Sequence, residues 1–262
     1  MNFFISCKVP TQVLSVITIL ISYFTPQLTT ALEATPNPNQ NFEQWCLQRT
    51  LLAAETKKTV EVLLEIASTQ DCKFANIKLY RLSKLNLSEV KDLSDIRPLA
   101  SFINLTDLDL RDNQIKDIQP LENLNKLTTL ELDGNRITDL KPLSSLTNLT
   151  SLYLSGNQID DVQPLSTLKK LTVLELIENH IRDVSPLENL NNLVSLELYH
   201  NQIRDVAPLA KLTGLTELYL GKNQIRDVKS LSSLINLTGL YLDENPILDR
   251  VCPIKPESVC NF

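Results

Sequence analysis

The sequence predicts an α/β solenoid: a right-handed horseshoe of stacked repeats, with a parallel sheet on its concave side, 3₁₀ turns on its convex side and a cap at each end. Two observations predict this fold. An asparagine recurs every 22 residues, and the residues around it repeat the pattern L-x-x-L-x-L-x-x-N-x-I. A fixed period of this length is typical of architectures in which each unit buries its apolar side only by stacking on its neighbours.

The first half of each repeat predicts a short strand. In the first regular copy, Leu108 and Leu110 alternate with Asp107, Asp109 and Arg111. This period of two places the leucines on one buried face and the polar side chains on the other. Seven regular copies follow an eighth, degenerate copy, so we expect eight repeats over residues 82–249 that stack as a parallel sheet.

The recurring asparagine stands where each strand must turn. Because a buried amide needs hydrogen-bond partners, we expect a ladder of asparagines bonded to backbone groups of their own loop and of the adjacent repeat. A solvent-facing turn asparagine is the alternative. The expected ladder consists of Asn113, Asn135, Asn157, Asn179, Asn201, Asn223 and Asn245.

The second half of each repeat predicts one turn of 3₁₀ helix. An aspartate such as Asp117 recurs there, and a proline such as Pro120 follows it by three residues in most copies. Aspartate is a good helix N-cap, and proline is tolerated in a first turn, where its missing N–H costs nothing. A 22-residue unit leaves too little chain for a full α-helix.

The N-terminus predicts an export signal. Residues 13–24 form an uncharged, mostly apolar run, which is short for a membrane span, and Lys8 precedes it. Thr29, Thr30 and Ala31 provide small residues at a cleavage site, with Ala34 as a second option. We expect a signal peptide over residues 1–31, a linker over 32–41 and no stable membrane span after cleavage. An uncleaved anchor is the alternative.

Caps are expected on both sides of the repeats. Residues 42–81 form the N-terminal cap, with a helical stretch over 42–71 whose apolar face carries Val60 and Leu64. We expect Phe42 and Trp45 to pack near Cys46. Residues 250–262 form the C-terminal cap, in which Ile254, Val259 and Phe262 cover the last repeat.

Four cysteines remain after the expected cleavage: Cys46, Cys72, Cys252 and Cys260. Eight strands at about 4.8 Å per step separate the two ends by roughly 35 Å. Because a disulfide needs Cα atoms within about 7 Å, only Cys46–Cys72 and Cys252–Cys260 can close. Both bonds lie in the caps, and no cysteine spacing matches a zinc site.

The 22-residue unit L-x-x-L-x-L-x-x-N-x-I-x-D-[ILV]-x-P-L-x-x-L-x-x, over about residues 82–249, resembles the internalin-type class of bacterial leucine-rich repeats. It is also similar to the repeat of eukaryotic phosphatase-regulatory leucine-rich proteins. The flanks, a Trp-Cys pair before the helix and C-P-x-K-P-E-S-x-C at the end, resemble exported leucine-rich proteins of cyanobacteria. The resemblance implies a binding module that uses its concave sheet face.

The outward strand positions contain a candidate binding face. We expect a diagonal apolar band, surrounded by acidic side chains, that runs for about 20 Å across the sheet. Tyrosine is favoured at binding hot spots, although strand packing alone also favours it. The candidate residues are Tyr153, Val173, Glu175, Ile177, Glu197, Tyr199, Glu217, Tyr219 and Tyr241.

Composition and motifs disfavour catalysis. The chain has two histidines, His180 and His200, and no nucleophile elbow or phosphate loop. The net charge of −6 disfavours nucleic acid and anionic membranes as partners. We expect a monomeric, non-enzymatic protein without cofactor or metal, secreted or in the periplasm or cell envelope, that binds a protein or a glycan. A cytoplasmic phosphatase-type regulatory subunit is the alternative, and an enzyme ranks third.

Overall fold

The computed structural model describes residues 40–262 of the chain. The expected signal peptide over residues 1–31 and most of the expected linker over 32–41 lie outside the described residues. The described residues belong to one compact unit. Its continuous core runs from Phe42 in the first helix to Val259 near the C-terminus, and both disulfides join residues of the same unit. This unit therefore carries the packing and cross-links that its own folding requires.

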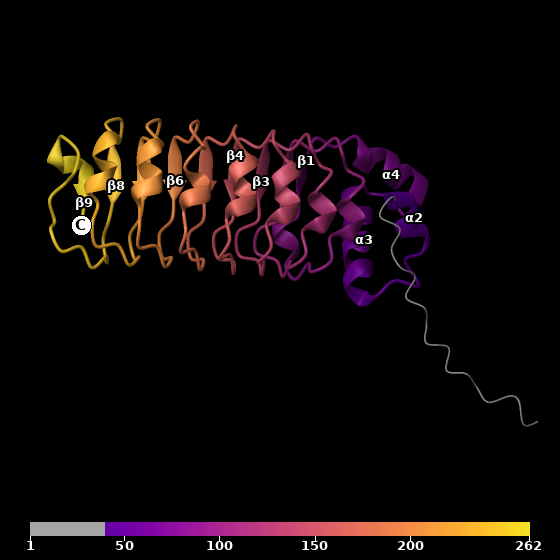
Figure 1. Ribbon diagram of the computed structural model, residues 1–262. Coiled ribbons are helices and arrows are strands. Elements are labelled where there is room, and N and C mark those ends of the chain that lie inside the picture. Colours follow the sequence, from indigo (N-terminus) through magenta and orange to yellow (C-terminus); the bar gives the residue numbers. More distant parts are fainter. Residues whose placement is uncertain (1–39) are drawn as a thin grey trace, which may run out of the picture. The chain divides into compact units, whose positions relative to one another are not determined.

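Short strands stack side by side into one parallel sheet (Figure 1), as the sequence predicts. Consecutive strands pair at the repeat spacing, so Leu108 lies beside Leu130 and Leu130 beside Leu152. The sheet has nine strands where the repeats alone predict eight, because the C-terminal cap adds one. In sheet order they are β1 Lys84–Asn86, β2 Asp107–Asp109, β3 Thr129–Glu131, β4 Ser151–Tyr153, β5 Val173–Glu175, β6 Ser195–Glu197, β7 Glu217–Tyr219, β8 Gly239–Tyr241 and β9 Cys260–Asn261.

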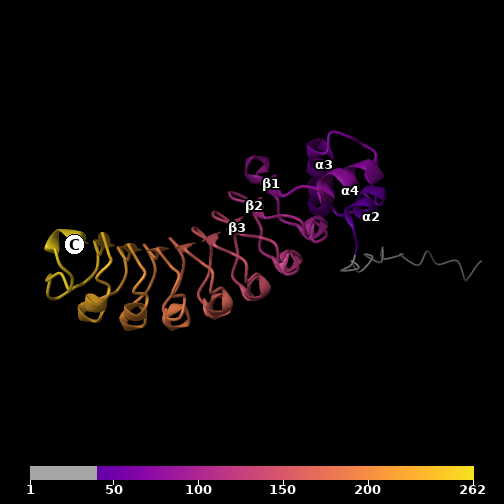
Figure 2. The same cartoon turned by 90° about the horizontal axis from the view of Figure 1, so that it is seen from above.

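The return half forms 3₁₀ helix in every repeat except the last, which confirms the prediction for the other seven. Seen from above, the repeat strands line one side and the 3₁₀ turns of the return halves line the other (Figure 2). These return turns are η2 Arg97–Leu99, η3 Gln119–Leu121, η4 Lys141–Ser145, η5 Gln163–Thr167, η6 Ser185–Leu187, η7 Ala207–Lys211 and η8 Lys229–Ser233. Two further 3₁₀ turns lie elsewhere: η1 Ser88–Val90 directly follows β1, and η9 Glu257–Val259 lies in the C-terminal cap.

The expected N-cap role of the recurring aspartates is wrong, because each aspartate lies one residue before the N-cap position. In η3 the N-cap is Ile118, whose side chain makes no capping hydrogen bond. Asp117 precedes it, and its Oδ1 accepts a hydrogen bond of 2.8 Å from the backbone N–H of Gln119. The cap position faces the core and must be apolar, so the carboxylate acts from one residue earlier, across a tight Asx-type turn.

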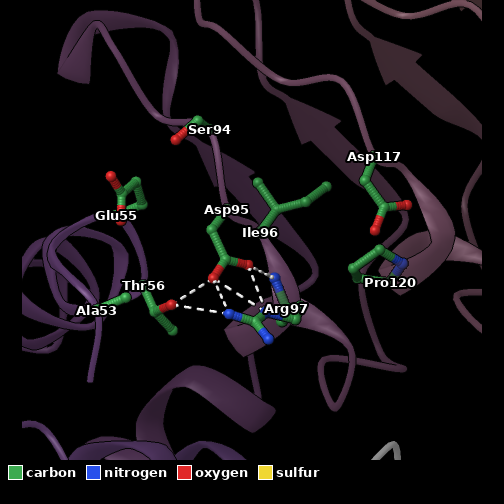
Figure 3. A pocket seen from close by; sticks show the side chains of 9 residues that line it. All are labelled: Ala53, Glu55, Thr56, Ser94, Asp95, Ile96, Arg97, Asp117 and Pro120. Atoms are coloured by element: carbon green, nitrogen blue, oxygen red, sulfur yellow. Dashed lines mark hydrogen bonds and ion pairs between the residues drawn. The ribbon is translucent and has the colours of Figure 1, made fainter. Parts of the chain in front are cut away.

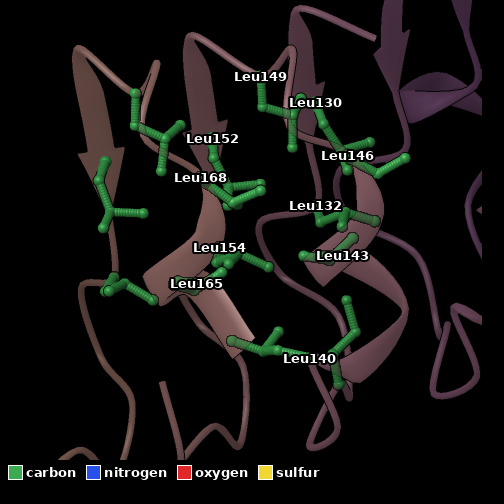
Figure 4. Close-up of a cluster of buried hydrophobic side chains, with 14 of the residues drawn as sticks. Leu130, Leu132, Leu140, Leu143, Leu146, Leu149, Leu152, Leu154, Leu165 and Leu168 are labelled. Atoms are coloured by element: carbon green, nitrogen blue, oxygen red, sulfur yellow. The ribbon is translucent and has the colours of Figure 1, made fainter. Parts of the chain in front are cut away.

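Leucines from strand and return fill the space between the two sides (Figure 4). Leu130 and Leu132, which flank the outward Glu131, meet Leu143 and Leu146, and all four are fully buried. Truncating a buried leucine costs about 2–5 kcal/mol, so these leucines contribute strongly to the stability of the shared core.

The asparagines form a buried ladder that connects each repeat with the preceding one. Asn135 Oδ1 accepts a hydrogen bond of 3.0 Å from the backbone N–H of Ile115. Its Nδ2 donates to the carbonyl of Leu110, also in the preceding repeat, and to that of Leu132 in its own. One amide thus satisfies backbone groups of two adjacent turns that no strand reaches.

The residue before each asparagine adopts a left-handed conformation. The φ angle is 63° at Gly134 and 65° at Gly156, but also 53° at Glu178, 56° at His200 and 53° at Lys222. Left-handed backbone disfavours residues with a β-carbon. The asparagine turn imposes this geometry in every regular repeat, whatever residue the sequence supplies.

The N-terminal cap is helical, as expected, but it is built from three helices. They are α2 Phe42–Leu47, α3 Ala54–Ile66 and α4 Cys72–Tyr80. The helical stretch expected over residues 42–71 is interrupted, because α2 ends at Leu47 and α3 begins at Ala54. The third helix lies beyond that range, where Asp71 caps the N–H of Phe74 at 3.0 Å. Apolar residues on all sides of the last helix hide its amphipathic period from the sequence.

Two contacts hold the cap together and against the first repeat. The disulfide Cys46–Cys72, with 5.5 Å between the Cα atoms, joins α2 to α4. Trp45 is buried and lies beneath the guanidinium of Arg97, 5.5 Å from its ring centre. The expected disulfide and the packing of Trp45 are both present, and the tryptophan is a core residue.

A polar cluster pins α3 to η2 at the edge of a surface recess (Figure 3). Arg97 Nη2 donates to Thr56 Oγ1 at 3.0 Å, and Thr56 Oγ1 donates to Asp95. Burial raises the pKa of Asp95, but hydrogen bonds from Arg97 and Thr56 outweigh it and lower the pKa below its usual value. Because these three side chains satisfy one another's hydrogen-bonding groups, we interpret the cluster as a structural contact between the cap and the first repeat.

The C-terminal cap closes the last repeat. Cys252 and Cys260 form the second expected disulfide, with 5.7 Å between the Cα atoms. The carbonyl of Asn261 in β9 accepts a hydrogen bond of 2.6 Å from the N–H of Leu242. Ile254 and Val259 are buried against the core, as expected.

Candidate binding face

The outward side chains of the sheet form three columns with one residue per repeat. In the central column, the strand register places Glu175 beside Glu197 and Tyr219 beside Tyr241. The central column is Asp109, Glu131, Tyr153, Glu175, Glu197, Tyr219 and Tyr241, and the flanking column is Asp107, Thr129, Ser151, Val173, Ser195, Glu217 and Gly239. The third column, just beyond the strands, is Arg111, Asp133, Ser155, Ile177, Tyr199, Gly221 and Asp243.

Two of the candidate tyrosines form a stacked pair. The rings of Tyr219 and Tyr241 are 4.3 Å apart between centroids, with an angle of 4° between their planes. Burial, followed by the neighbouring hydroxyl of Tyr241, raises the pKa of Tyr219 to about 12. Both side chains remain partly exposed, so the pair presents an aromatic surface to solvent.

A glycine makes room for this pair. A β-carbon on Gly239 would lie 2.8 Å from a ring carbon of Tyr241 and would collide with the carboxylate of Glu217. The inner oxygen of that carboxylate, Oε2, is buried and accepts no hydrogen bond from the described residues. The other oxygen accepts one from Thr238 Oγ1 at 2.9 Å.

Gly221 makes room for the ring of Tyr199, as Gly239 does for Tyr241. A β-carbon on Gly221 would stand 2.8 Å from Tyr199 Cδ2 and 2.6 Å from Asp243 Oδ1. Tyr199 reaches across this gap, and its hydroxyl donates to Glu244 Oε1, two repeats further on, at 3.5 Å. Sequence reasoning missed the role of both glycines. The available signal was a residue without a side chain in an outward column next to a tyrosine.

The expected apolar band is uneven. Tyr199, Tyr219 and Tyr241 lie on consecutive rungs, and Ile177 precedes Tyr199 in the third column. Tyr153 lies apart from the stacked pair in the central column, because the acidic rungs Glu175 and Glu197 separate them. The aromatic surface is therefore concentrated over β6–β8.

The acidic side chains beside this surface repel one another. Burial, followed by repulsion from Glu197, raises the pKa of Glu175 to about 7. Burial, followed by repulsion from Glu217, also raises the pKa of Glu197. The one basic side chain of the three columns, Arg111, is bound at 2.8 Å to both Asp109 and Glu131 at the other end of the sheet. The outward columns over β5–β7 therefore carry acidic side chains and no basic one.

The two histidines do not assemble a catalytic site in the described part of the chain. His200 Nδ1 lies 3.7 Å from Glu178 Oε1, and this nitrogen makes no hydrogen bond there. No group of three metal-binding side chains occurs among residues 40–262. What the structure does bring together over β6–β8 is three tyrosines beside a row of glutamates.

Comparisons with known proteins agree with this geometry. The family model described as leucine-rich repeats (2 copies) matches residues 103–145, 125–167 and 169–211. A crystal structure of internalin C2 from Listeria monocytogenes is 34% identical, with a TM-score of 0.70, and the match covers 77% of this chain and 89% of that chain. Comparison with curated protein sequences gives no significant match.

Two further solved structures are similar. Internalin InlF from Listeria monocytogenes is 31% identical with a TM-score of 0.54, over 73% of this chain and 70% of that chain. The structure of PEPR1–AtPEP1 is 26% identical with a TM-score of 0.55, over 66% of this chain and 27% of that chain.

Proposed function

The chain belongs to the internalin-type leucine-rich repeat proteins, and on that premise we propose that it is a non-enzymatic module that binds a partner protein on its sheet face outside the cytoplasm. The stacked pair Tyr219–Tyr241 carries the proposal. Ordered, partly exposed aromatic rings are the side chains that dominate binding energy at interfaces, because they bury a large area at a small cost in conformational entropy.

The charge of the face defines the chemistry of the partner. Glu175, Glu197 and Glu217 occupy consecutive strands next to the tyrosines. A partner that brings lysine or arginine side chains would relieve their mutual repulsion, and its cations could lie over the tyrosine rings. We therefore propose a partner protein with a basic surface. A hydroxyl-rich glycan, which carries less charge, is the alternative partner.

A location outside the cytoplasm is supported by the caps. The disulfides Cys46–Cys72 and Cys252–Cys260 are typical of oxidising compartments. Within the described residues, no helix is long and apolar enough to cross a membrane. Intact mass of the protein from its native producer tests the location. A mass starting near Leu32 or Thr35 with four oxidised cysteines supports export, and a full-length mass with free thiols would favour a cytoplasmic regulatory subunit.

Affinity capture tests the binding face. We expect the Tyr199→Ala/Tyr219→Ala variant to lose the partners that the unchanged protein captures from the medium and cell envelope of its producer. The control is Arg204→Ala/Arg226→Ala, which removes two exposed side chains outside the three columns. Undiminished capture by the tyrosine variant, with a thermal midpoint equal to that of the control, would rule out this face as the binding site.

A further inference from the structure

Helix α4 is apolar on both of its sides. Ala75 and Leu79 are buried against the rest of the cap. On the opposite side, the exposed fractions are 62% for Phe74, 39% for Ile77 and 44% for Tyr80. Residues three apart share a helix face, so these three side chains form one stripe. Exposed apolar side chains that share one face often mark a contact surface, and the described residues do not cover this stripe.

Two more exposed apolar side chains lie at the end of α2 and in the loop after it. The disulfide between Cys46 and Cys72 brings the end of α2 to the start of α4. Leu47, which follows Cys46 directly, is 68% exposed, and Leu51 is 86% exposed. The cap surface is defined as the α4 stripe of Phe74, Ile77 and Tyr80, and these two leucines add apolar area to the same cap.

The segment that carries α4 has a charge opposite to that of the chain as a whole, although Asp71 caps the N-terminus of the helix. Four basic residues and no acidic one lie between Cys72 and Ser88, although the net charge of the chain is −6. Two of the four are held locally, Lys78 by the carbonyl of Ala67 and Lys84 by Asp107. Lys73 and Arg81 are exposed and adjoin the stripe.

We propose that the cap surface docks on an anionic lipid bilayer. A helix side with aromatic and aliphatic residues flanked by lysine and arginine is the pattern of helices that lie in the membrane interface. Tyrosine suits that position because its ring is apolar and its hydroxyl stays hydrated. The negative net charge of the chain would disfavour binding to an anionic membrane only if the charge were spread evenly. Here the acidic side chains of the binding face lie in the repeats and not in the cap.

Vesicle sedimentation of residues 38–262, the unit with its own core, tests this proposal without the apolar run of residues 13–24. We expect binding to phosphatidylglycerol–phosphatidylcholine vesicles, much weaker binding to phosphatidylcholine alone, and loss of binding at high salt. Each basic side chain near an anionic surface contributes about fivefold to the partition coefficient. The Lys73→Glu/Arg81→Glu variant should therefore bind at least about 25-fold more weakly.

Two further variants separate the contributions. Lys169→Glu/Lys170→Glu makes the same change of charge at two exposed positions in a repeat loop and should bind like the unchanged protein. Phe74→Ser/Ile77→Ser leaves the charge unchanged and should weaken binding. Equal losses in both charge-reversal variants, or no binding to anionic vesicles by the unchanged unit, would overturn the proposal. Light scattering that shows self-association lost only in Lys73→Glu/Arg81→Glu, without vesicle binding, would assign the surface to a second copy.

Discussion

The ring of Tyr199 lies in the space that a side chain at position 221 would occupy, so its position depends on Gly221. A β-carbon on Gly221 would stand 2.8 Å from Tyr199 Cδ2, closer than such atoms approach in folded proteins. We expect Gly221→Ala to displace the ring and to cost about 1–3 kcal/mol, the usual range for overpacking. Chemical denaturation measures the cost. In the double variant Tyr199→Ala/Gly221→Ala, the two costs should be less than additive, and strict additivity would contradict the contact.

The acidic rungs make stability depend on pH. The pKa of Glu175 is raised from 4.5 to about 7 in the folded chain, so the folded state binds this proton more tightly than the unfolded state. The protonated Glu175 side chain therefore contributes to the free energy of unfolding in full below about pH 4.5, and this contribution is lost as the pH rises through about 7. Glu175→Gln should therefore raise the thermal midpoint at about pH 9 and leave it unchanged at about pH 4. Solvent screening limits the gain to about 1 kcal/mol or less.

The control for the pH experiment is Glu65→Gln, at an exposed position on α3 away from the acidic rungs. It should produce no pH-dependent difference from the unchanged protein. If both variants respond to pH alike, general net charge and not the neighbourhood of Glu175 causes the effect.

The left-handed position before each asparagine distinguishes glycine from other residues. A β-carbon at Gly156 would meet only the backbone of Gly134, at 3.5 Å or more, so Gly156→Ala isolates the conformational cost. We expect it to destabilise the chain by about 1 kcal/mol. Lys222→Ala should be close to neutral, because that position already has a β-carbon at a φ of 53°. Equal unfolding free energies for the two variants would contradict this explanation.

The asparagine ladder predicts a large cost for a small truncation. Asn179 Oδ1 accepts from the N–H of Ile159 at 3.0 Å, and its Nδ2 donates to the carbonyl of Leu154 at 3.0 Å. Asn179→Ala leaves both groups buried without partners and should cost about 1–3 kcal/mol in denaturant unfolding. The matched control is Asn189→Ala, whose exposed amide bonds only to the side chain of Glu188. A control that is equally destabilised would show that truncation itself, and not the ladder, is responsible.

The sequence predicts this fold well where one rule applies to many residues. The 22-residue period predicts the strand register, the three outward columns and the 3₁₀ turns, because every repeat must match its neighbour. The same period locates Tyr219 beside Tyr241. It does not predict that their rings stack, since that depends on the space beside them at Gly239.

The caps were harder to predict because their residues do not repeat. Residues 250–262 contain no recognisable strand pattern, and β9 exists because the edge of β8 offers it a partner. Likewise, α4 is apolar on two sides, so its sequence shows no amphipathic period from which to assign the buried face.

The two-residue strand β9 has a consequence for how the protein behaves at high concentration. Without it, β8 would offer its unpaired N–H and C=O groups to any passing chain, and a stack of near-identical repeats is a ready template for end-to-end growth. β9 covers part of that edge and then stops after Asn261, too short to support another full strand. The Cys252–Cys260 bond keeps it in place. The C-terminal cap therefore leaves less unpaired strand edge at this end of the sheet than β8 alone would expose, which disfavours edge-to-edge association.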